Sequence, residues 1–182
     1  MVKLRDLLAL LPPHLVADSQ WQSLNHPALD AEVKGLSTNS WACQPGDLFI
    51  GMPGTRVDGG SFWQNAIEAG AIAAIVSTQV ERPSSADSGL VIPMHDMNEA
   101  CASLATSFYH DPTQTLKMVG ITGTNGKTTT SHLVEYLLNQ TQRSTALLGT
   151  LYARWPGHEK TATHTTPFAV ELQQTLADAL AA

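Results

Sequence analysis

The chain has 182 residues, 43% of them hydrophobic, and carries 10 Lys and Arg against 16 Asp and Glu, a formal net charge of −6. This length suits one large or two small domains with a proper core. The acidic balance argues against a broad basic surface for nucleic acid or anionic lipid. No uninterrupted apolar run approaches the ~18–20 residues that span a bilayer. We therefore expect a cytoplasmic protein with no nucleic acid partner and no membrane insertion.

The N-terminal segment does not read as a secretory signal. Asp6 interrupts its apolar stretch, and two prolines stand where a small-residue cleavage site is expected, so a short amphipathic helix over about 3–11 is predicted. Cys43 and Cys101 have no paired-motif spacing. This favours buried or incidental free thiols in a reducing compartment over a disulfide or a zinc site.

Residues 1–114 read as an α/β domain. Gly70 closes one predicted helix, Asp96 with Glu99 forms a plausible capping box for another, and the polar segment 81–89 is expected to be an exposed loop. The predicted elements after the first helix are strands at about 33–38 and 46–51, a helix at about 61–69, strands at about 71–77 and 90–93, and a helix at about 96–109.

Residues 115–182 read as the opening of a nucleotide-binding domain, joined to the first domain by a linker over 110–115. The prediction is a short buried strand at 117–121, a glycine-rich loop, and a helix to about 141 with one apolar face at 133, 134, 137 and 138. A strand at 144–149, a polar connection and a helix from about Pro167 to the end follow.

The glycine-rich loop between that strand and helix is the most informative feature of the sequence. Its backbone N–H groups can converge on phosphate oxygens, the Lys127 ammonium can reach the β/γ-phosphates, and the Thr128 hydroxyl can ligate Mg²⁺. The alternative is an ordinary turn rich in Gly, Thr and Asn. Lys127 and Thr128 are the predicted catalytic residues, Thr128 is the predicted metal ligand, and the predicted nucleotide-binding residues are Gly123, Thr124, Asn125, Gly126, Lys127, Thr128 and Thr129.

The second domain looks unfinished by this reasoning. The segment 115–182 is long enough for about two βα units, whereas a nucleotide-binding parallel sheet usually has five or more strands. It also contains no hydrophobic strand ending in an acidic residue that would hold Mg²⁺ opposite Thr128. We therefore expect a truncated piece of a longer enzyme that is inactive alone, with a C-terminal helix that lacks neighbours for its apolar face.

Several motifs together resemble the Mur ligase family of peptidoglycan synthesis. The loop 123–128 is similar to that of the Mur ligases and of the folylpolyglutamate and cyanophycin synthetases. The segments 37–54, 57–59 and 108–112 look like the uridine-nucleotide domain of the MurE type. The resemblance implies a small N-terminal α/β domain that binds the UDP-linked substrate, followed by the start of a P-loop parallel-sheet ATPase domain.

The resemblance also implies a set of substrate-binding residues. In MurE-like ligases an Asp-Ser-Arg stretch after the first strand contacts UDP. Here Asn39 and Trp41 replace the acid and the arginine, which leaves Thr38 and Ser40 as the contacts. The other implied substrate contacts are Thr55, Arg56 and Val57 in the next loop, and His164, Thr165 and Thr166 before the last helix. On sequence chemistry alone, Ser40 could instead cap a turn, Arg56 could be a solvated loop residue, and 166–167 could be an ordinary helix start.

The implied chemistry is ATP-dependent and Mg²⁺-dependent amide formation through an acyl phosphate. The implied substrates are UDP-N-acetylmuramoyl-L-alanyl-D-glutamate and an amino acid, either meso-diaminopimelate or L-lysine, and the complete enzyme is expected to be a monomer. Three alternatives stay open at this point: another Mur-type ligase such as MurF or cyanophycin synthetase, a P-loop NTPase of different role, and a nonenzymatic module that binds a UDP-sugar.

Overall fold

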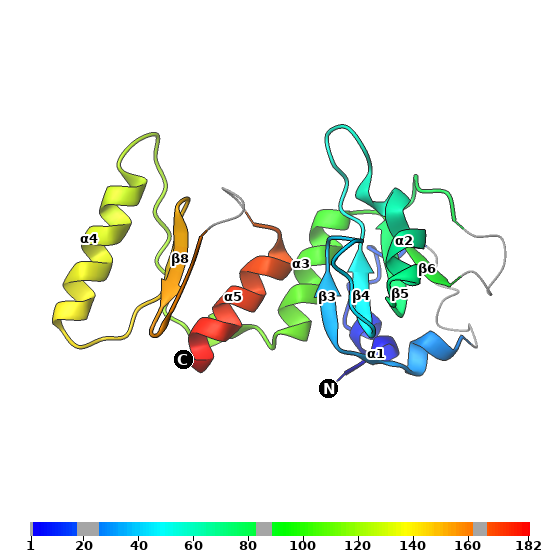
Figure 1. Cartoon of the computed structure of the whole chain (residues 1–182), viewed down its shortest axis with the longest axis horizontal. Helices are drawn as coiled ribbons and strands as arrows, with labels where there is room; N and C mark the ends of the chain where they lie inside the picture. The colour runs from blue at the N-terminus through cyan, green and yellow to red at the C-terminus, as the bar shows by residue number, and fades with distance from the viewer. Residues whose placement is uncertain (1, 18–25, 83–88, 162–166) are drawn as a thin grey trace. The chain divides into compact units, whose positions relative to one another are not determined.

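The computed structural model describes residues 2–17, 26–82, 89–161 and 167–182. These residues form two compact units, Met1–Phe108 and Tyr109–Ala182, which are considered one at a time (Figure 1). The expected mixed α/β class is confirmed. The predicted domain boundary between residues 114 and 115 lies a few residues beyond the division between the units and stays a prediction. No helix in the described part of the chain has the length and apolar character needed to cross a membrane.

The first unit is built on a four-stranded parallel sheet in the order β3, β4, β5, β6. In its register Leu36 lies opposite Leu48, and Phe49 lies opposite Ala74. Parallel neighbours need crossover connections, and the connection from β4 to β5 contains the helix α2 (Trp63–Glu68). The sheet strands are β3 (Gly35–Ser37), β4 (Asp47–Ile50), β5 (Ala73–Ser77) and β6 (Leu90–Met94), and a separate antiparallel pair joins β1 (Val2–Lys3) to β2 (Glu32–Val33).

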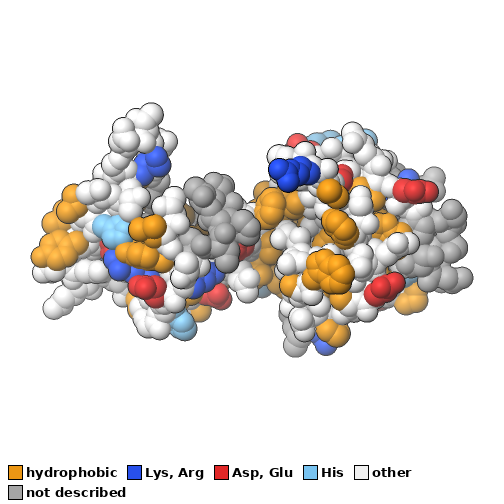
Figure 2. All heavy atoms as spheres, turned by 45° about the horizontal axis from the view of Figure 1, so that its top comes forward, with side chains coloured by type: hydrophobic (Ala, Val, Ile, Leu, Met, Phe, Trp, Pro, Cys, Tyr) orange, Lys and Arg blue, Asp and Glu red, His pale blue; other side chains and the backbone are white. Residues whose placement is uncertain are grey.

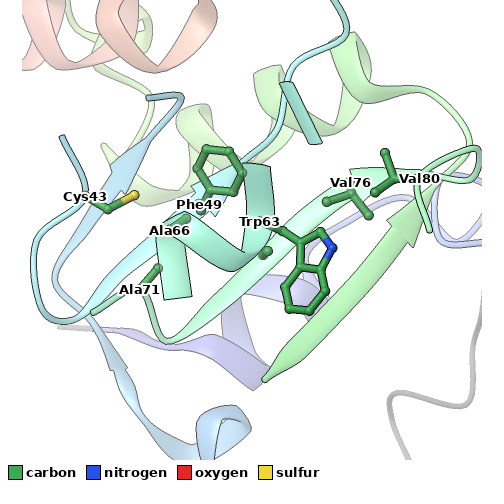
Figure 3. Close-up of a cluster of buried hydrophobic side chains, with 8 residues drawn as sticks. Cys43, Phe49, Trp63, Ala66, Ala71, Val76 and Val80 are labelled. Carbon is green, nitrogen blue, oxygen red and sulfur yellow. The ribbon is translucent and has the colours of Figure 1, made fainter. Parts of the chain in front are cut away.

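Both faces of this sheet are buried, which explains why β4 and β5 read as unbroken apolar runs. Phe49 and Val76 point to the face covered by α2 (Trp63–Glu68), where they join the cluster that contains Trp63 (Figure 3). The alternate residues Leu48 and Ile75 are fully buried on the opposite face. Other buried apolar side chains come from α1 (Leu4–Ala9) and α3 (Met97–Phe108), which contact each other.

The helix boundaries of the first unit follow local signals in the sequence. Asp96 Oδ1 accepts hydrogen bonds from the backbone N–H groups of Asn98 and Glu99 at 2.9 and 3.0 Å, which confirms the predicted cap of α3. Gly70, with φ +109°, follows α2 as predicted. Two 3₁₀ helices, η2 (Pro27–Asp30) and η3 (Gly59–Phe62), precede β2 and α2 respectively. Most of the predicted loop at 81–89 lies outside the described residues.

The second unit is a layer of antiparallel strands between two helices. The sheet has the order β7 (Leu147–Leu148), β8 (Tyr152–Trp155), β9 (His158–Thr161). Helix α4 (Lys127–Gln140) contacts β8 on one face of this sheet, and α5 (Ala169–Ala181) contacts β9 on the other (Figure 1). A short 3₁₀ helix, η5 (Pro112–Gln114), packs against α5.

The predicted strand at 117–121 is wrong. Residues 117–126 form no helix or strand, and Met118 and Val119 are 57% and 67% exposed. A strand exists only where another strand pairs with its backbone groups, and no strand in the described residues lies against this segment. The strands described in this unit pair antiparallel, so the parallel sheet expected there is not seen among them.

The polar connection expected after residue 149 is also wrong, because it contains the β8–β9 hairpin. The predicted strand at 144–149 is limited to Leu147–Leu148. The sequence did carry a signal for the hairpin: Pro156-Gly157 separates two short runs, and Gly157 has φ +77°. The second strand was not predicted because residues 158–161 are polar, and all four of them are exposed in the structure.

Both helices of the second unit are present, but their packing differs from the expectation. On α4 the predicted apolar face is not buried, since Leu133 and Leu137 are exposed and the one buried residue is Glu135. Hydrophobic side chains are accordingly visible on the surface of the second unit over α4 (Figure 2). On α5, Val170 and Leu176 are buried, so this helix has the neighbours that we expected it to lack.

Candidate functional site

The glycine loop has a backbone conformation that suits glycine at two positions. Gly123 has φ +148° and Gly126 has φ +79°. A Cβ atom added at Gly123 would have only the Asn125 carbonyl oxygen nearby, at 3.5 Å, and one at Gly126 only Thr130 Oγ1, at 4.0 Å. The space beside both glycines is therefore open, as a loop that receives a ligand requires.

Lys127, the first residue of α4, lies across this loop. Its Nζ donates a hydrogen bond to the Gly123 carbonyl oxygen at 2.5 Å, so the side chain folds back over the loop while it stays exposed to solvent. Thr128 follows in the first turn of the helix, where unpaired backbone N–H groups and the helix dipole favour an anion. The side chains of both residues are exposed and accessible to a ligand.

A cavity of about 360 Å³ lies beside Lys127 and Thr128. It is bounded by the starts of α4 and α5 and by the ends of the strands between them. Besides these two residues, its lining consists of Val119, Ile121, Ser131, Leu148, Gly149, Thr150, Ala153, Lys160, Thr161, Pro167, Glu171, Leu172 and Thr175. Most of these residues are 20 to 50 positions away from the loop, so no local motif could have identified them.

His132 connects the first turn of α4 to the sheet. Its Nδ1 lies 2.7 Å from the Thr128 carbonyl oxygen, and its Nε2 contacts the Tyr152 hydroxyl. A carbonyl oxygen can only accept, so Nδ1 carries the proton, and in the neutral imidazole Nε2 accepts from Tyr152. The two rings meet edge to face, with centroids 5.5 Å apart. The Thr128 carbonyl, in the first turn of α4, is thus linked through His132 to Tyr152 of β8.

A second contact joins α4 to β8 one turn further along. Arg154 donates from Nε to Glu135 Oε1 at 2.7 Å and from Nη2 to Glu135 Oε2, which makes a bidentate pair. The hydrogen bond to Glu135 raises the pKa of Arg154. The guanidinium also lies 5.0 Å from the centroid of the Tyr152 ring. These contacts hold β8, whose Ala153 lines the cavity, against the helix that begins at the glycine loop.

In the first unit, the turn after β3 contains the predicted substrate contacts Thr38 and Ser40. Ser37 Oγ accepts from the Asn39 N–H at 3.2 Å, and Asn39 Oδ1 accepts from the Trp41 N–H at 3.0 Å. Ser37 and Asn39 therefore make the capping bonds of this turn, a role that the sequence left open for Ser40. Ser40 itself is buried, and Thr38 is half-buried.

The loop after β4 carries Thr55, Arg56 and Val57, all of them exposed. Its base is anchored by Asp58, whose Oδ1 accepts from the Gly60 N–H and whose Oδ2 accepts from Ser77 Oγ, both at 2.8 Å. Because β3 and β4 are neighbouring parallel strands, this loop and the turn with Thr38 and Ser40 both follow carboxyl ends at the same edge of the sheet. That edge is where α/β sheets generally bind ligands.

The third predicted substrate segment, His164, Thr165 and Thr166, lies outside the described residues. Cys43 and Cys101 are both buried, and neither is in a disulfide within the described residues. Across 2–17, 26–82, 89–161 and 167–182, no group of three or more His, Cys, Asp or Glu side chains is placed to hold a metal ion.

The parallel sheet of the first unit and the helices and strands of the second define an α/β protein, in which a cavity lies beside the glycine loop of the second unit. The sequence matches two family descriptions, "Mur ligase family, catalytic domain" over residues 32–109 and "Mur ligase middle domain" over residues 121–182. The chain belongs to the Mur ligase family.

Similar curated proteins carry the name UDP-N-acetylmuramoyl-L-alanyl-D-glutamate–2,6-diaminopimelate ligase. The protein from Synechocystis sp. is 62% identical over all of this chain and 37% of its own length, and that from Trichormus variabilis is 61% identical over 98% and 35%. This chain thus spans about a third of the length of these relatives. Among solved structures, a ligase of the same name aligns with 99% of this chain and 34% of its own at a TM-score of 0.64, and at 24% identity it supports the fold alone.

Proposed function

We propose that this chain provides the UDP-substrate and ATP sites of a ligase that makes an amide bond in peptidoglycan precursor synthesis. In this reaction an amino acid is joined to UDP-N-acetylmuramoyl-L-alanyl-D-glutamate. The names of the similar proteins favour diaminopimelate over L-lysine as that amino acid. The observation that carries the proposal is the open glycine loop, with Lys127 and Thr128 at the wall of a cavity.

The chemistry follows from the weakness of a carboxylate as an acyl donor. A carboxylate oxygen of the substrate attacks the γ-phosphorus of ATP, ADP leaves, and an acyl phosphate forms. The amine of the incoming amino acid then attacks the acyl carbon, phosphate leaves, and the amide bond forms. Lys127 would leave the Gly123 carbonyl and stabilise the negative charge of the transferring phosphoryl group.

The residues of the loop fit a nucleotide with its Mg²⁺. The Thr128 hydroxyl is exposed at the start of α4 and would ligate Mg²⁺ together with phosphate oxygens. When bound, the ion neutralises charge on the phosphates and orients them. The exposed backbone of 123–129 would hold the phosphates. At the sheet edge of the first unit, Thr38, Ser40 and the loop 55–57 would contact the UDP part of the substrate, and Arg56 would offset diphosphate charge.

Ligand titration of the 182-residue chain tests this proposal. Binding of ATP with Mg²⁺ is measured by calorimetry for the wild type, for Lys127→Ala, and for the matched control Lys117→Ala, which removes the same charge from an exposed lysine that does not line the cavity. We expect the first variant to lose at least about tenfold in ATP affinity, since a charge-assisted contact to phosphate is removed, and the control to match the wild type.

Two further titrations separate the proposal from its alternatives. A P-loop switch protein of a different role would prefer GTP or ignore UDP-N-acetylmuramoyl-L-alanyl-D-glutamate, and a nonenzymatic UDP-sugar module would bind that compound but not ATP. Binding of both ATP and the UDP-linked dipeptide supports the ligase. Equal ATP affinity of the wild type and Lys127→Ala contradicts the assignment of the loop.

A further inference from the structure

The cavity beside the glycine loop is lined by a second lysine, which is not part of any motif recognised in the sequence. Lys160, on the edge strand β9, lines it together with Lys127, and Glu171 is the remaining charged side chain of the lining. Two ammonium groups and one carboxylate give the cavity a positive formal charge, although the chain as a whole is acidic. The two lysines belong to different elements, one at the start of α4 and one on β9.

The contacts of Lys160 direct its ammonium without neutralising it. Within the described residues, Nζ donates to Thr175 Oγ1 at 2.8 Å and lies 5.7 Å from the centroid of the Trp155 ring. Thr175 is buried, and its hydroxyl donates in turn to the main-chain oxygen of Glu171 at 2.8 Å. This differs from Arg154 in the same sheet, whose charge is matched by the carboxylate of Glu135.

The cavity also has two helix starts in its wall. Lys127 and Thr128 come from the first turn of α4, and Pro167, Glu171 and Leu172 come from the start of α5. The helix dipole favours an anion at each start, and both helices are longer than three turns. The cavity therefore has two separate positions that favour an anion.

We propose that Lys160 binds the carboxylate of the acidic substrate, the group that the nucleotide activates. This inference rests on the proposed function, in which a carboxylate must approach a triphosphate that repels it. A second cation in the cavity, on a different element from Lys127, offsets that repulsion and holds the carboxylate in place. Lys127 and the start of α4 then bind the phosphates, whereas Lys160 and the start of α5 bind the carboxylate.

A cycle of protein variants and substrate analogues tests the inference. UDP-N-acetylmuramoyl-L-alanyl-D-glutamate, and the analogue with D-glutamine in place of D-glutamate, are titrated into the chain in the presence of Mg²⁺ and a nonhydrolysable ATP analogue. The proteins are the wild type, Lys160→Met, Lys160→Gln, Lys160→Arg and the control Lys117→Met. Thermal melts establish whether each variant is folded. If Lys160→Met does not fold, Lys160→Gln replaces it in the comparison.

We expect Lys160→Met to lose about five- to tenfold in affinity for the glutamate compound, with less than about a twofold change for the glutamine analogue and for the ATP analogue. Lys160→Arg should recover most of the loss. Equal losses for the two dipeptide compounds, or no loss for either, would overturn the role of Lys160 and leave the proposed function intact. A wild-type chain that binds neither ATP nor the dipeptide would refute the proposed function itself.

Discussion

Replacing Gly51 by alanine should destabilise the first unit and disturb its candidate substrate loop. A Cβ at Gly51 would lie 2.3 Å from the Cα of Gly60 and 2.6 Å from its backbone nitrogen. Both are backbone atoms, so no side chain can rotate away. The Gly60 N–H is also held by Asp58, which is itself bonded to Ser77. The backbones at Gly51 and Gly60 therefore have little freedom to move apart.

The size of the effect can be worked from this geometry. Ordinary contact to a Cβ begins near 3.4 Å, so the two backbones would have to separate by more than 1 Å. Overpacking of this kind costs about 1–3 kcal/mol, and a clash with backbone belongs at the upper end. Alanine also restricts the unfolded chain, which returns about 0.4–1 kcal/mol. A net loss of about 2 kcal/mol corresponds to a melting temperature lower by about 8 °C or more for a unit of this size.

Thermal unfolding followed by circular dichroism measures this change. Gly120→Ala is the matched control, because a Cβ there would meet nothing within 4 Å and the same chemical change should cost nothing. Titration with UDP provides a second readout, since Thr55, Arg56 and Val57 extend from the base formed by Gly51 and Gly60. A Gly51→Ala protein that melts within about 2 °C of the wild type would refute the reasoning, because no clash of about 2 kcal/mol could then exist.

Three further predictions concern local contacts. Asp96→Ala should lower the stability of the first unit by about 1 kcal/mol in urea unfolding through loss of the α3 cap, whereas Asp96→Asn should retain most of it, and equal losses would exclude capping. Tyr152→Phe should speed hydrogen exchange of the first-turn amides of α4 about fivefold by removing the hydroxyl bonded to His132, and unchanged exchange would show that this contact does not hold the turn. Burial raises the pKa of the Cys43 thiol above 9.0; a hydrogen bond with Ser37 opposes this shift, and the charge of Asp47 adds a smaller increase. The buried neutral thiol therefore contributes its full stabilisation below pH 9, and that stabilisation is lost as the pH rises through the raised pKa. The urea midpoint of the wild type should therefore fall more steeply above pH 9 than that of Cys43→Ala, and parallel curves would contradict the shift.

The candidate site was predictable where its residues are neighbours in the sequence. The loop 123–129 is one continuous segment, and its two positive φ values occur at glycines that the motif supplies. Thr38, Ser40 and the loop 55–57 were named from the family resemblance, and their contact with the substrate stays a prediction; the structure places them after two neighbouring strands of the parallel sheet. Lys160 and Thr175 could not be assigned, since only the folding of β9 and α5 around the cavity relates them to Lys127.

The sequence by itself determined the helix starts and the four strands of the parallel sheet in the first unit, because caps, glycine conformations and apolar runs act over a few residues; the pair β1–β2 was not predicted. Only the tertiary structure decided the rest. Residues 117–121 have the apolar pattern of a strand, but no strand among the described residues pairs with them; the polar residues of β9 do form a strand, because β8 pairs with them. Glu135 is the buried residue of α4, and Leu137 is exposed, because Arg154 faces one and no described residue covers the other. Strand pairing and burial depend on groups that are distant in sequence, and a local pattern carries no information about them.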